Sequence, residues 1–251
     1  MTDPTLTLAI QALDTAQNVG VLVPSANPVV EPELNRLLPP TLHLFAARLP
    51  VMPGTTLLER NRRYIESYPT ALDSFGALSL AAVIIGMTGP SYRLLPPADQ
   101  ALAAQLSRPG RPVQTASGAI ADALTALDAR RICLFSPYPQ WLTDEAAAYW
   151  SAAGHDTVQV VKISETFRAY DLTTPEIAKA LQTIRPDGID AVVMSGTGML
   201  TLPAIIAARA ARPIPFLSSN ICSAWWLMRA TGVTQPTPLF AAAAPELAAR
   251  L

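Results

Sequence analysis

The strongest constraint on the fold is an internal repeat. The stretch AVIIGMTG at 82–89 has a counterpart in AVVMSGTG at 191–198, so Thr88 and Thr197 stand 109 positions apart. Two more pairs follow in the same order: VPSANP at 23–28 with LFSPYP at 134–139, and RPVQTAS at 111–117 with RPIPFLS at 212–218. Their displacements are 111 and 101 positions. Three ordered pairs at similar spacing predict a duplicated unit of about a hundred residues, hence two similar halves and not a solenoid.

Each half alternates short β-branched runs with longer helical patterns. The strand candidates are 19–23, 42–47, 82–86, 132–135, 158–161, 191–195 and 214–217. These apolar runs are nearly continuous, which indicates parallel strands buried on both faces. The helix candidates include 57–75, 118–127, 141–153, 174–183 and 223–230. This alternation predicts an α/β fold of two pseudo-symmetric Rossmann-like lobes with parallel sheets and a cleft between them.

The composition favours a small molecule as the partner. The 251 residues are 50% hydrophobic and 15% charged, which suits a globular chain with a large core. Eighteen Lys and Arg against nineteen Asp and Glu give a net charge of −1, which argues against a broad basic face. No apolar run reaches the roughly 18 residues of a membrane span, and the first 17 residues lack the basic region of a secretory signal. We expect a cytoplasmic protein that binds neither nucleic acid nor membrane.

Matched polar residues follow the strands, where α/β sheets bind their ligands. Thr88 and Thr197 each offer a hydroxyl, and the adjacent Gly89 and Gly198 allow backbone N–H groups to approach an anion. Such paired donors suit a carboxylate or an enediolate formed from it.

A second pair, Asn27 with Tyr138, offers an amide and a phenol. Serine and threonine after strands also serve as helix caps and turn formers. That interpretation is favoured for Ser25, Ser117 and Ser218 taken singly. It is less suited to the two symmetric pairs.

Four segments carry a resemblance: VGVLVPSANPVVEPEL, AVIIGMTGPSY, AVVMSGTGMLTLPAI and FLSSNICSAWWL. In this order they resemble the signature segments of the aspartate/glutamate racemase superfamily, and most of all its maleate isomerase and arylmalonate decarboxylase branch. The likeness spans about 18–232. It implies a cleft that binds a small carboxylate without cofactor or metal. It also implies that residues 18–114 plus 215–251 form one lobe and 115–214 the other.

The resemblance includes two departures. In that superfamily a cysteine normally precedes the Thr of each turn, and decarboxylases retain only the second. Met87 and Gly196 hold these places here, and neither side chain can carry a proton or act as a nucleophile, so the two-thiol chemistry is not available. The chain's cysteines, Cys133 and Cys222, lie in apolar contexts and are expected to be buried.

The resemblance also implies roles for the candidate residues. Asn27 and Tyr138 match positions that contact substrate carboxylates, and the tyrosine can donate to a developing oxyanion. The catalytic candidates are Tyr138, Thr88 and Thr197. The substrate-binding candidates are Asn27, Ser25, Gly89, Gly198, Met87, Gly196, Ser218 and Asn220.

Two functions remain open at this point. The first is a cofactor-free lyase or isomerase, decarboxylase-like or maleate isomerase-like, acting on a small carboxylate or dicarboxylate, with a proton from Tyr138, water or Cys222. Decarboxylation fits better than racemisation because loss of CO₂ needs charge stabilisation more than a base. The second is a noncatalytic carboxylate-binding pseudoenzyme. No phosphate cradle or clustered metal-ligand spacing occurs, so neither nucleotide nor metal is predicted. The sequence leaves open whether the chain forms a homo-oligomer.

Overall fold

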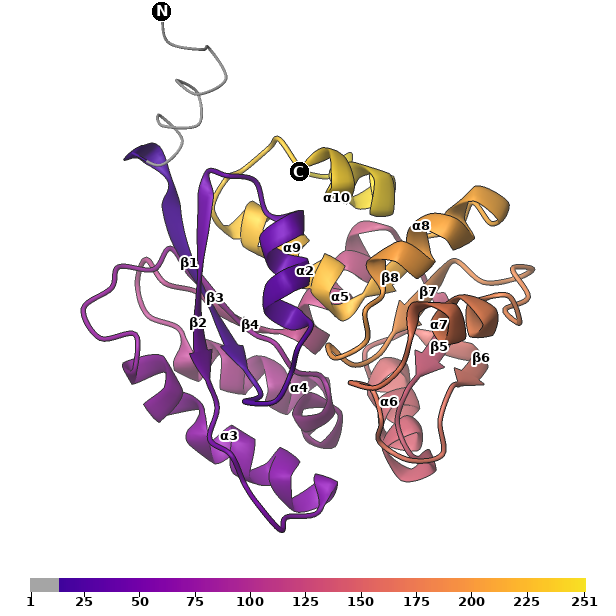
Figure 1. The fold of residues 1–251 in the computed structure, drawn as a ribbon, viewed down its shortest axis with the longest axis horizontal. Coiled ribbons are helices and arrows are strands. Elements are labelled where there is room, and N and C mark those ends of the chain that lie inside the picture. The colour runs from indigo at the N-terminus through magenta and orange to yellow at the C-terminus, as the bar shows by residue number, and fades with distance from the viewer. Residues whose placement is uncertain (1–13) are drawn as a thin grey trace, which may run out of the picture.

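Two parallel sheets form the centre of the computed structural model, which describes residues 14–251. The first contains β1 (Gln17–Val23), β2 (Leu42–Arg48), β3 (Ala82–Ile85) and β4 (Val113–Thr115), in the order β2-β1-β3-β4. The second contains β5 (Arg131–Ser136), β6 (Asp156–Lys162), β7 (Ala191–Met194) and β8 (Phe216–Ser218), in the order β6-β5-β7-β8. Figure 1 shows the two sheets beside each other. The predicted α/β fold, with two halves of one topology, is confirmed.

The strand register corrects the spacing of the repeat. Leu22 O and Phe135 O accept equivalent hydrogen bonds from the residue after the neighbouring strand, at 2.8 and 2.9 Å. The first strands of the two halves are therefore 113 positions apart, and the predicted match of Ser25 with Ser136 is wrong. Strands buried on both faces look alike after a shift of two residues, because every position is apolar and the shift preserves which face each side chain occupies.

A similar shift applies to the last strands of the two sheets. Thr115 and Ser218 occupy the same register position. Both cap the next helix, because Thr115 accepts from Gly118 N at 2.9 Å and Ser218 accepts from Ile221 N at 3.2 Å. Ser218 thus corresponds to Thr115, and the predicted match with Ser117 is wrong.

Helices connect the strands and cover the sheets. Those that overlap the predicted helices are α3 (Leu57–Asp73), α5 (Ala116–Ala126), α6 (Gln140–Ala152), α7 (Thr174–Leu181) and α9 (Ser219–Ala230). The others are α2 (Val30–Leu37), α4 (Gly89–Leu106), α8 (Leu202–Ala211), α10 (Pro238–Ala243) and α11 (Pro245–Ala248). The N-termini of several helices carry a cap; in α7, Thr173 and Glu176 form a capping box.

Helix α4 was not predicted from the sequence because it contains Pro96 and Pro97. Leu95 has a φ of 62°, so the helix breaks there and the prolines open a second helical segment. The second segment is fixed by a buried carboxylate, since Asp99 accepts a hydrogen bond from Thr115 Oγ1 at 2.7 Å.

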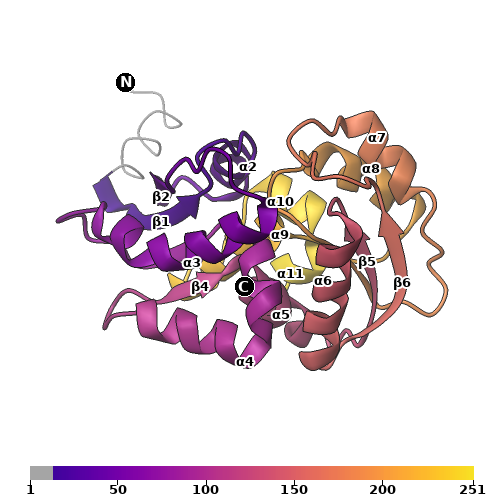
Figure 2. The same ribbon diagram turned by 90° about the horizontal axis from the view of Figure 1, so that it is seen from below.

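The two halves share one apolar core. Helices α5 and α9 pack against each other between the sheets, as Figure 2 shows, and α9 also contacts α2 and β3 of the first half. A single buried cluster runs from Val19 of β1 to Phe216 of β8. The relative positions of the two sheets are therefore held by hydrophobic burial.

The strand β8 corrects one predicted lobe boundary. Residues from 215 onward were predicted to belong to the first lobe, but β8 pairs with β7 and completes the second sheet. The chain crosses to the first half only with α9. The remaining boundaries stay a prediction.

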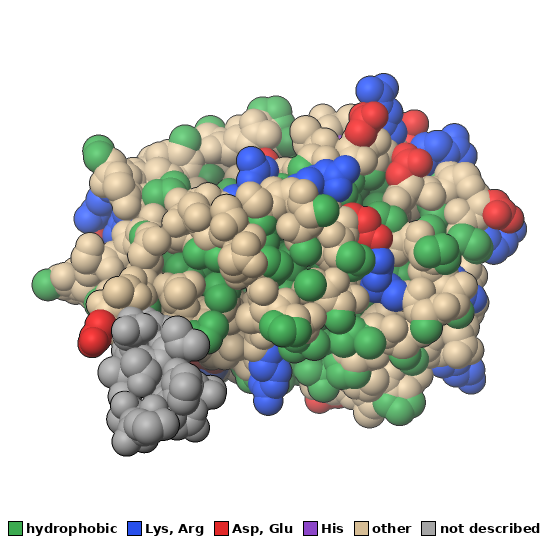
Figure 3. Space-filling view, turned by 90° about the horizontal axis from the view of Figure 1, so that it is seen from above, with side chains coloured by type: hydrophobic (Ala, Val, Ile, Leu, Met, Phe, Trp, Pro, Cys, Tyr) green, Lys and Arg blue, Asp and Glu red, His purple; other side chains and the backbone are tan. Residues whose placement is uncertain are grey.

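Two expectations concern the surface. Between residues 14 and 251 no helix combines the length and the apolar character that a bilayer span requires. On the face shown in Figure 3, positive and negative side chains are interspersed, without a broad basic patch. The expectation about a secretory signal falls mostly on residues 1–13, outside the described part of the chain.

Candidate active site

The turns that follow β1, β3, β5 and β7 meet in a cavity of about 460 Å³ between the two sheets. Parallel strands of one sheet end at the same edge, so each sheet contributes two turns. Nine predicted residues line the cavity: Ser25, Asn27, Met87, Thr88, Gly89, Tyr138, Gly196, Thr197 and Gly198. The duplicated turns thus converge on one space, although the roles of these residues stay predictions.

Thr88, at the first turn, is bonded to the other half of the molecule. Its side chain is buried, and its Oγ1 accepts a hydrogen bond from Gly196 N at 3.1 Å. The same oxygen lies 2.8 Å from Tyr138 Oη, and either hydroxyl can donate. When Thr88 donates, the phenol hydrogen of Tyr138 remains for an acceptor in the cavity.

Thr197, at the second turn, makes the reciprocal connection. Its Oγ1 accepts from Asn27 Nδ2 at 3.2 Å and donates to Gly86 O at 2.8 Å. The side-chain oxygen of Asn27, Oδ1, also has a partner, because it accepts a hydrogen bond from Val29 N at 2.9 Å. The hydroxyl hydrogen of Thr197 therefore points at a backbone oxygen and not at the cavity.

Tyr138 is the residue of the cavity wall whose pKa is shifted most by its surroundings. It is 5% exposed, and its ring stacks on Phe167 with centroids 6.0 Å apart. Burial raises the pKa of the Tyr138 phenol far above its usual range, and Tyr92 adds to this electrostatically. The phenol is therefore neutral at ordinary pH, so it can donate a hydrogen bond or a proton but cannot act as a base.

Glycine is required at the two turns because neighbouring side chains leave no room for a Cβ atom. A Cβ on Gly89 would lie 2.9 Å from Asn61 Nδ2, and a Cβ on Gly198 would lie 2.4 Å from the Tyr170 ring. An amide thus covers the first turn and an aromatic ring covers the second. Gly196 has a φ of +85°, and its Cβ would lie 3.2 Å from Tyr138 Oη. Any other side chain there would be strained.

Two predicted binding residues do not line the cavity. Ser218 caps α9 behind it. Asn220 is buried, and its Nδ2 donates to Glu33 Oε2 at 2.8 Å and to Thr197 O at 3.2 Å. Both lie one layer behind the turns, because β8 ends beside β7 and its polar residues begin a helix. Asn220 therefore holds the second turn from outside the cavity wall, and its contact with a ligand stays a prediction.

Glu33 is a buried carboxylate behind that turn. It accepts from the backbone of Thr201 at 2.7 Å and Leu202 at 3.1 Å, so it caps the N-terminus of α8 from a distant helix. Burial raises the Glu33 pKa, against which these hydrogen bonds act. The residue fixes α8 and α9 against α2.

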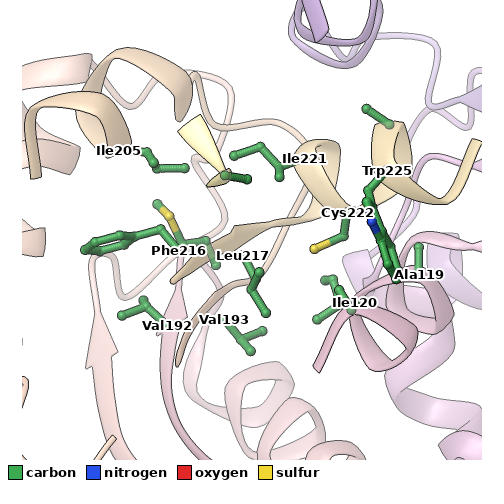
Figure 4. Close-up of a cluster of buried hydrophobic side chains, with 14 of the residues drawn as sticks. Ala119, Ile120, Val192, Val193, Ile205, Phe216, Leu217, Ile221, Cys222 and Trp225 are labelled. Atoms are coloured by element: carbon green, nitrogen blue, oxygen red, sulfur yellow. The ribbon is translucent and has the colours of Figure 1, made fainter. Parts of the chain in front are cut away.

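The cysteines are remote from the cavity wall. Cys133 and Cys222 are both fully buried, and among the described residues no cysteine lines the cavity. Figure 4 shows Cys222 among apolar side chains that include Ile120 and Trp225. Burial raises the pKa of the Cys133 thiol to about 12 and that of Cys222 further. Cys222 is thus ill placed as the proton donor considered from the sequence. The described residues also hold no His, Cys, Asp and Glu cluster suited to a metal ion.

Sequence reasoning missed much of the cavity wall, including two groups of polar and aromatic residues. Arg60, Asn61 and Tyr64 come from α3, and Phe167 and Tyr170 come from the segment after β6. Arg60, Asn61 and Tyr64 lie inside a helix and not after a strand, where the ligand-binding residues of α/β folds are expected. A signal existed in α3, since polar Asn61 shares a helix face with buried tyrosines, where an apolar residue is expected.

The sequence matches the family model described as arylmalonate decarboxylase over residues 19–239. The maleate isomerase of Nocardia farcinica (strain IFM 10152) is 26% identical over 237 residues, which is 88% of this chain and 93% of that protein. Because the family model covers most of the sequence, this chain belongs to the arylmalonate decarboxylase family.

Solved structures of the same branch share the fold. The maleate isomerase of Pseudomonas putida S16 with maleate superposes with a TM-score of 0.81 at 20% identity, covering 91% of this chain and 99% of that chain. Arylmalonate decarboxylase superposes with a TM-score of 0.70 at 24% identity, covering 89% and 98%. The Nocardia farcinica maleate cis-trans isomerase, in a cysteine-to-serine mutant with a covalently bound succinylcysteine intermediate, gives 0.78 at 21% identity, covering 93% and 99%.

Proposed function

We propose that this chain is a cofactor-free enzyme of decarboxylase or isomerase type that acts on a small carboxylic acid bound between the twin turns. The observation that carries this proposal is the buried hydrogen-bond chain from Gly196 N through Thr88 to the Tyr138 phenol, which ends in the cavity. The relatives' names agree with it, since they are maleate isomerases and arylmalonate decarboxylases. The ligand class, a small carboxylate, follows from that relationship.

The cavity supports decarboxylation better than isomerisation through a thiol. The Nocardia farcinica isomerase carries a succinylcysteine intermediate, which requires a reactive cysteine. Here Met87 and Gly196 occupy the two turns, and no cysteine among the described residues reaches the cavity. We infer that the usual thiols are replaced and that the chemistry proceeds without a covalent sulfur adduct.

A decarboxylation uses what the cavity offers. The bond from the α-carbon to the departing carboxylate breaks, CO₂ leaves, and the electron pair remains on the other carboxylate as an enediolate. Tyr138 donates a hydrogen bond to the developing negative charge, which is a stabilisation realised in the transition state. A proton from the phenol or from water then reaches the α-carbon, and water restores the phenol if it was used. Burial raises the pKa of the phenol, so the phenol stays protonated and remains a hydrogen-bond donor.

The experiment is direct incubation with phenylmalonate, methylmalonate and maleate, followed by proton NMR. Appearance of phenylacetate or propionate shows decarboxylation, and appearance of fumarate shows isomerisation. The Tyr138→Phe variant, purified in parallel, controls for a contaminating enzyme. Absence of turnover of all three acids would contradict the proposal, and tight binding without turnover would favour a noncatalytic carboxylate-binding protein. A homo-oligomer and a cytoplasmic location stay predictions.

A further inference from the structure

One hydrogen-bond donor in the cavity wall has no protein acceptor. Asn61 is 5% exposed, and its Nδ2 atom is buried without a hydrogen-bond partner among residues 14–251. Asn61 lines the cavity, and Nδ2 lies 2.9 Å from the position that a Cβ on Gly89 would take. A buried donor left unpaired costs free energy, so such a group in a native structure calls for an acceptor that binds there.

The preceding residue brings an unpaired positive charge to the same wall. Arg60 lines the cavity, and its Cζ lies 5.9 Å from the centroid of the Phe167 ring. Its guanidinium makes no ion pair or hydrogen bond with the described residues. The other arginine of the wall, Arg168, is engaged by Glu176 at 3.0 Å. Arg60 is thus a cation in the described wall whose charge no carboxylate neutralises.

Helix α3 holds both groups in fixed positions. It is a 17-residue helix whose N-terminus is capped by Thr56, which accepts from Glu59 N at 3.1 Å. Binding groups on a rigid helix are placed more accurately than groups on a loop. Neither residue takes part in the hydrogen bonds of the twin turns, which join Thr88 to Tyr138 and Gly196 and join Thr197 to Asn27.

We propose that Arg60 and Asn61 form a second binding subsite on α3, in which each residue recognises one anionic group of the ligand. The subsite rests on the proposed function, since the ligand is the acid bound at the turns. Asn61 Nδ2 donates to an oxygen of the group beside Gly89. Arg60 supplies the positive charge for a second anionic group farther along the cavity, where its planar fork suits carboxylate and phosphate geometry. Arg60 then sets the preference for acids with two anionic ends, and Asn61 binds the end that mono- and dicarboxylic acids share.

The test measures affinities by calorimetry for two matched acids that are not decarboxylated. Succinate has a carboxylate at both ends, and butyrate has a methyl group in place of one. We expect the wild type to prefer succinate by at least about tenfold. Arg60→Gln removes this preference by weakening succinate about tenfold while leaving butyrate within about twofold. Asn61→Leu weakens both acids by about ten- to a hundredfold, since each loses a hydrogen bond to a charged group.

Two controls separate recognition from folding. Arg62→Gln removes the same charge two residues further along α3, where the side chain is exposed, and leaves both affinities within about twofold. Asn61→Leu leaves Tm unchanged or raised, because no protein hydrogen bond is lost. An asparagine with a structural role would instead lower Tm. 3-Phosphonopropionate distinguishes the source of the anionic group: binding tighter than succinate, lost in Arg60→Gln, assigns a phosphate-like group, and tighter succinate assigns a carboxylate.

Unchanged affinities of both acids in Arg60→Gln and Asn61→Leu overturn the subsite. If the wild type still converts phenylmalonate or maleate, the proposed function stands without it. A wild type that neither binds these acids nor converts any of the substrates overturns both proposals together.

Discussion

The two turns of the duplicated unit contain hydrogen-bond chains of the same construction that end in different places. At the first turn, Thr88 accepts from Gly196 N and joins the Tyr138 phenol in the cavity wall. At the second, Thr197 accepts from Asn27 and donates to a backbone oxygen inside the first half. Both hydroxyls thus join the halves, but only Thr88 reaches the Tyr138 phenol, which we propose donates to the ligand.

The surroundings of the turns reinforce this difference. Asn61 covers the first turn with an unpaired amide, whereas the Tyr170 ring covers the second. Behind the second turn, Glu33 already occupies the N-terminus of α8. We therefore propose that the polar recognition of an acid belongs chiefly to the first turn, while the second half contributes Tyr138 and the rings of Phe167 and Tyr170.

The largest expected effect is the loss of the phenol. Tyr138→Phe lowers kcat/KM for phenylmalonate by about 100-fold, because it removes a donor to the developing oxyanion. Tyr170→Phe is the matched control, since that hydroxyl also lines the cavity but makes no hydrogen bond with the described residues. Steady-state kinetics measure both. Equal losses of kcat/KM in the two variants would show that the Tyr138 hydroxyl does not stabilise the transition state.

Substitution of each of the two threonines, Thr88 and Thr197, tests whether the two turns differ in function. Thr88→Val lowers kcat/KM about tenfold, because Tyr138 loses its orienting partner. Thr197→Val keeps kcat/KM within about threefold but lowers the free energy of unfolding by roughly 1–3 kcal/mol, since Asn27 Nδ2 and Gly86 O are left buried and unpaired. Kinetics and urea denaturation give the two values. A greater rate loss for Thr197→Val would reverse the assignment.

Positions 87 and 196, where we infer that thiols have been replaced, are expected to differ in their tolerance of cysteine. Gly196→Cys costs about 1–3 kcal/mol of unfolding free energy, because its φ of +85° strains an L-residue and its Cβ would press on Tyr138. Met87→Cys costs roughly half as much or less, since Met87 does not have a positive φ. Urea denaturation measures both. Equal stability of the two variants would mean that the backbone at 196 relaxes freely.

The smallest expected effect is on the pH dependence. An ordinary cysteine loses its proton near pH 8.5, whereas burial holds the Tyr138 pKa above its ordinary value of 10. The phenol stays protonated as the pH rises, so kcat/KM for phenylmalonate stays level from about pH 7.5 to 9.5. Stopped assays in overlapping buffers measure the profile. A fall with an apparent pKa near 8.5 would indicate a reactive thiol.

Much of the fold was predictable from the sequence, because the apolar strands and the repeat reflect one duplicated topology. The alignment of Ser25 with Ser136 failed because an apolar strand shifted by two residues looks the same. Helix α4 was not predicted because Pro96 and Pro97 indicate the end of a helix. The threonines of the turns were found since they follow strands. Asn61 was missed because only the folded chain shows that its amide lies against Gly89.

The central claim is that one acid binds between the turns on the Thr88 side. The most direct measurement is a crystal structure of the Tyr138→Phe variant with phenylmalonate, in which slow turnover preserves the acid. We expect a carboxylate oxygen within hydrogen-bond distance of Thr88 Oγ1 or Asn61 Nδ2, with Thr197 still bonded to Gly86 O. A carboxylate bound to Thr197 and distant from both of the other side chains would contradict it.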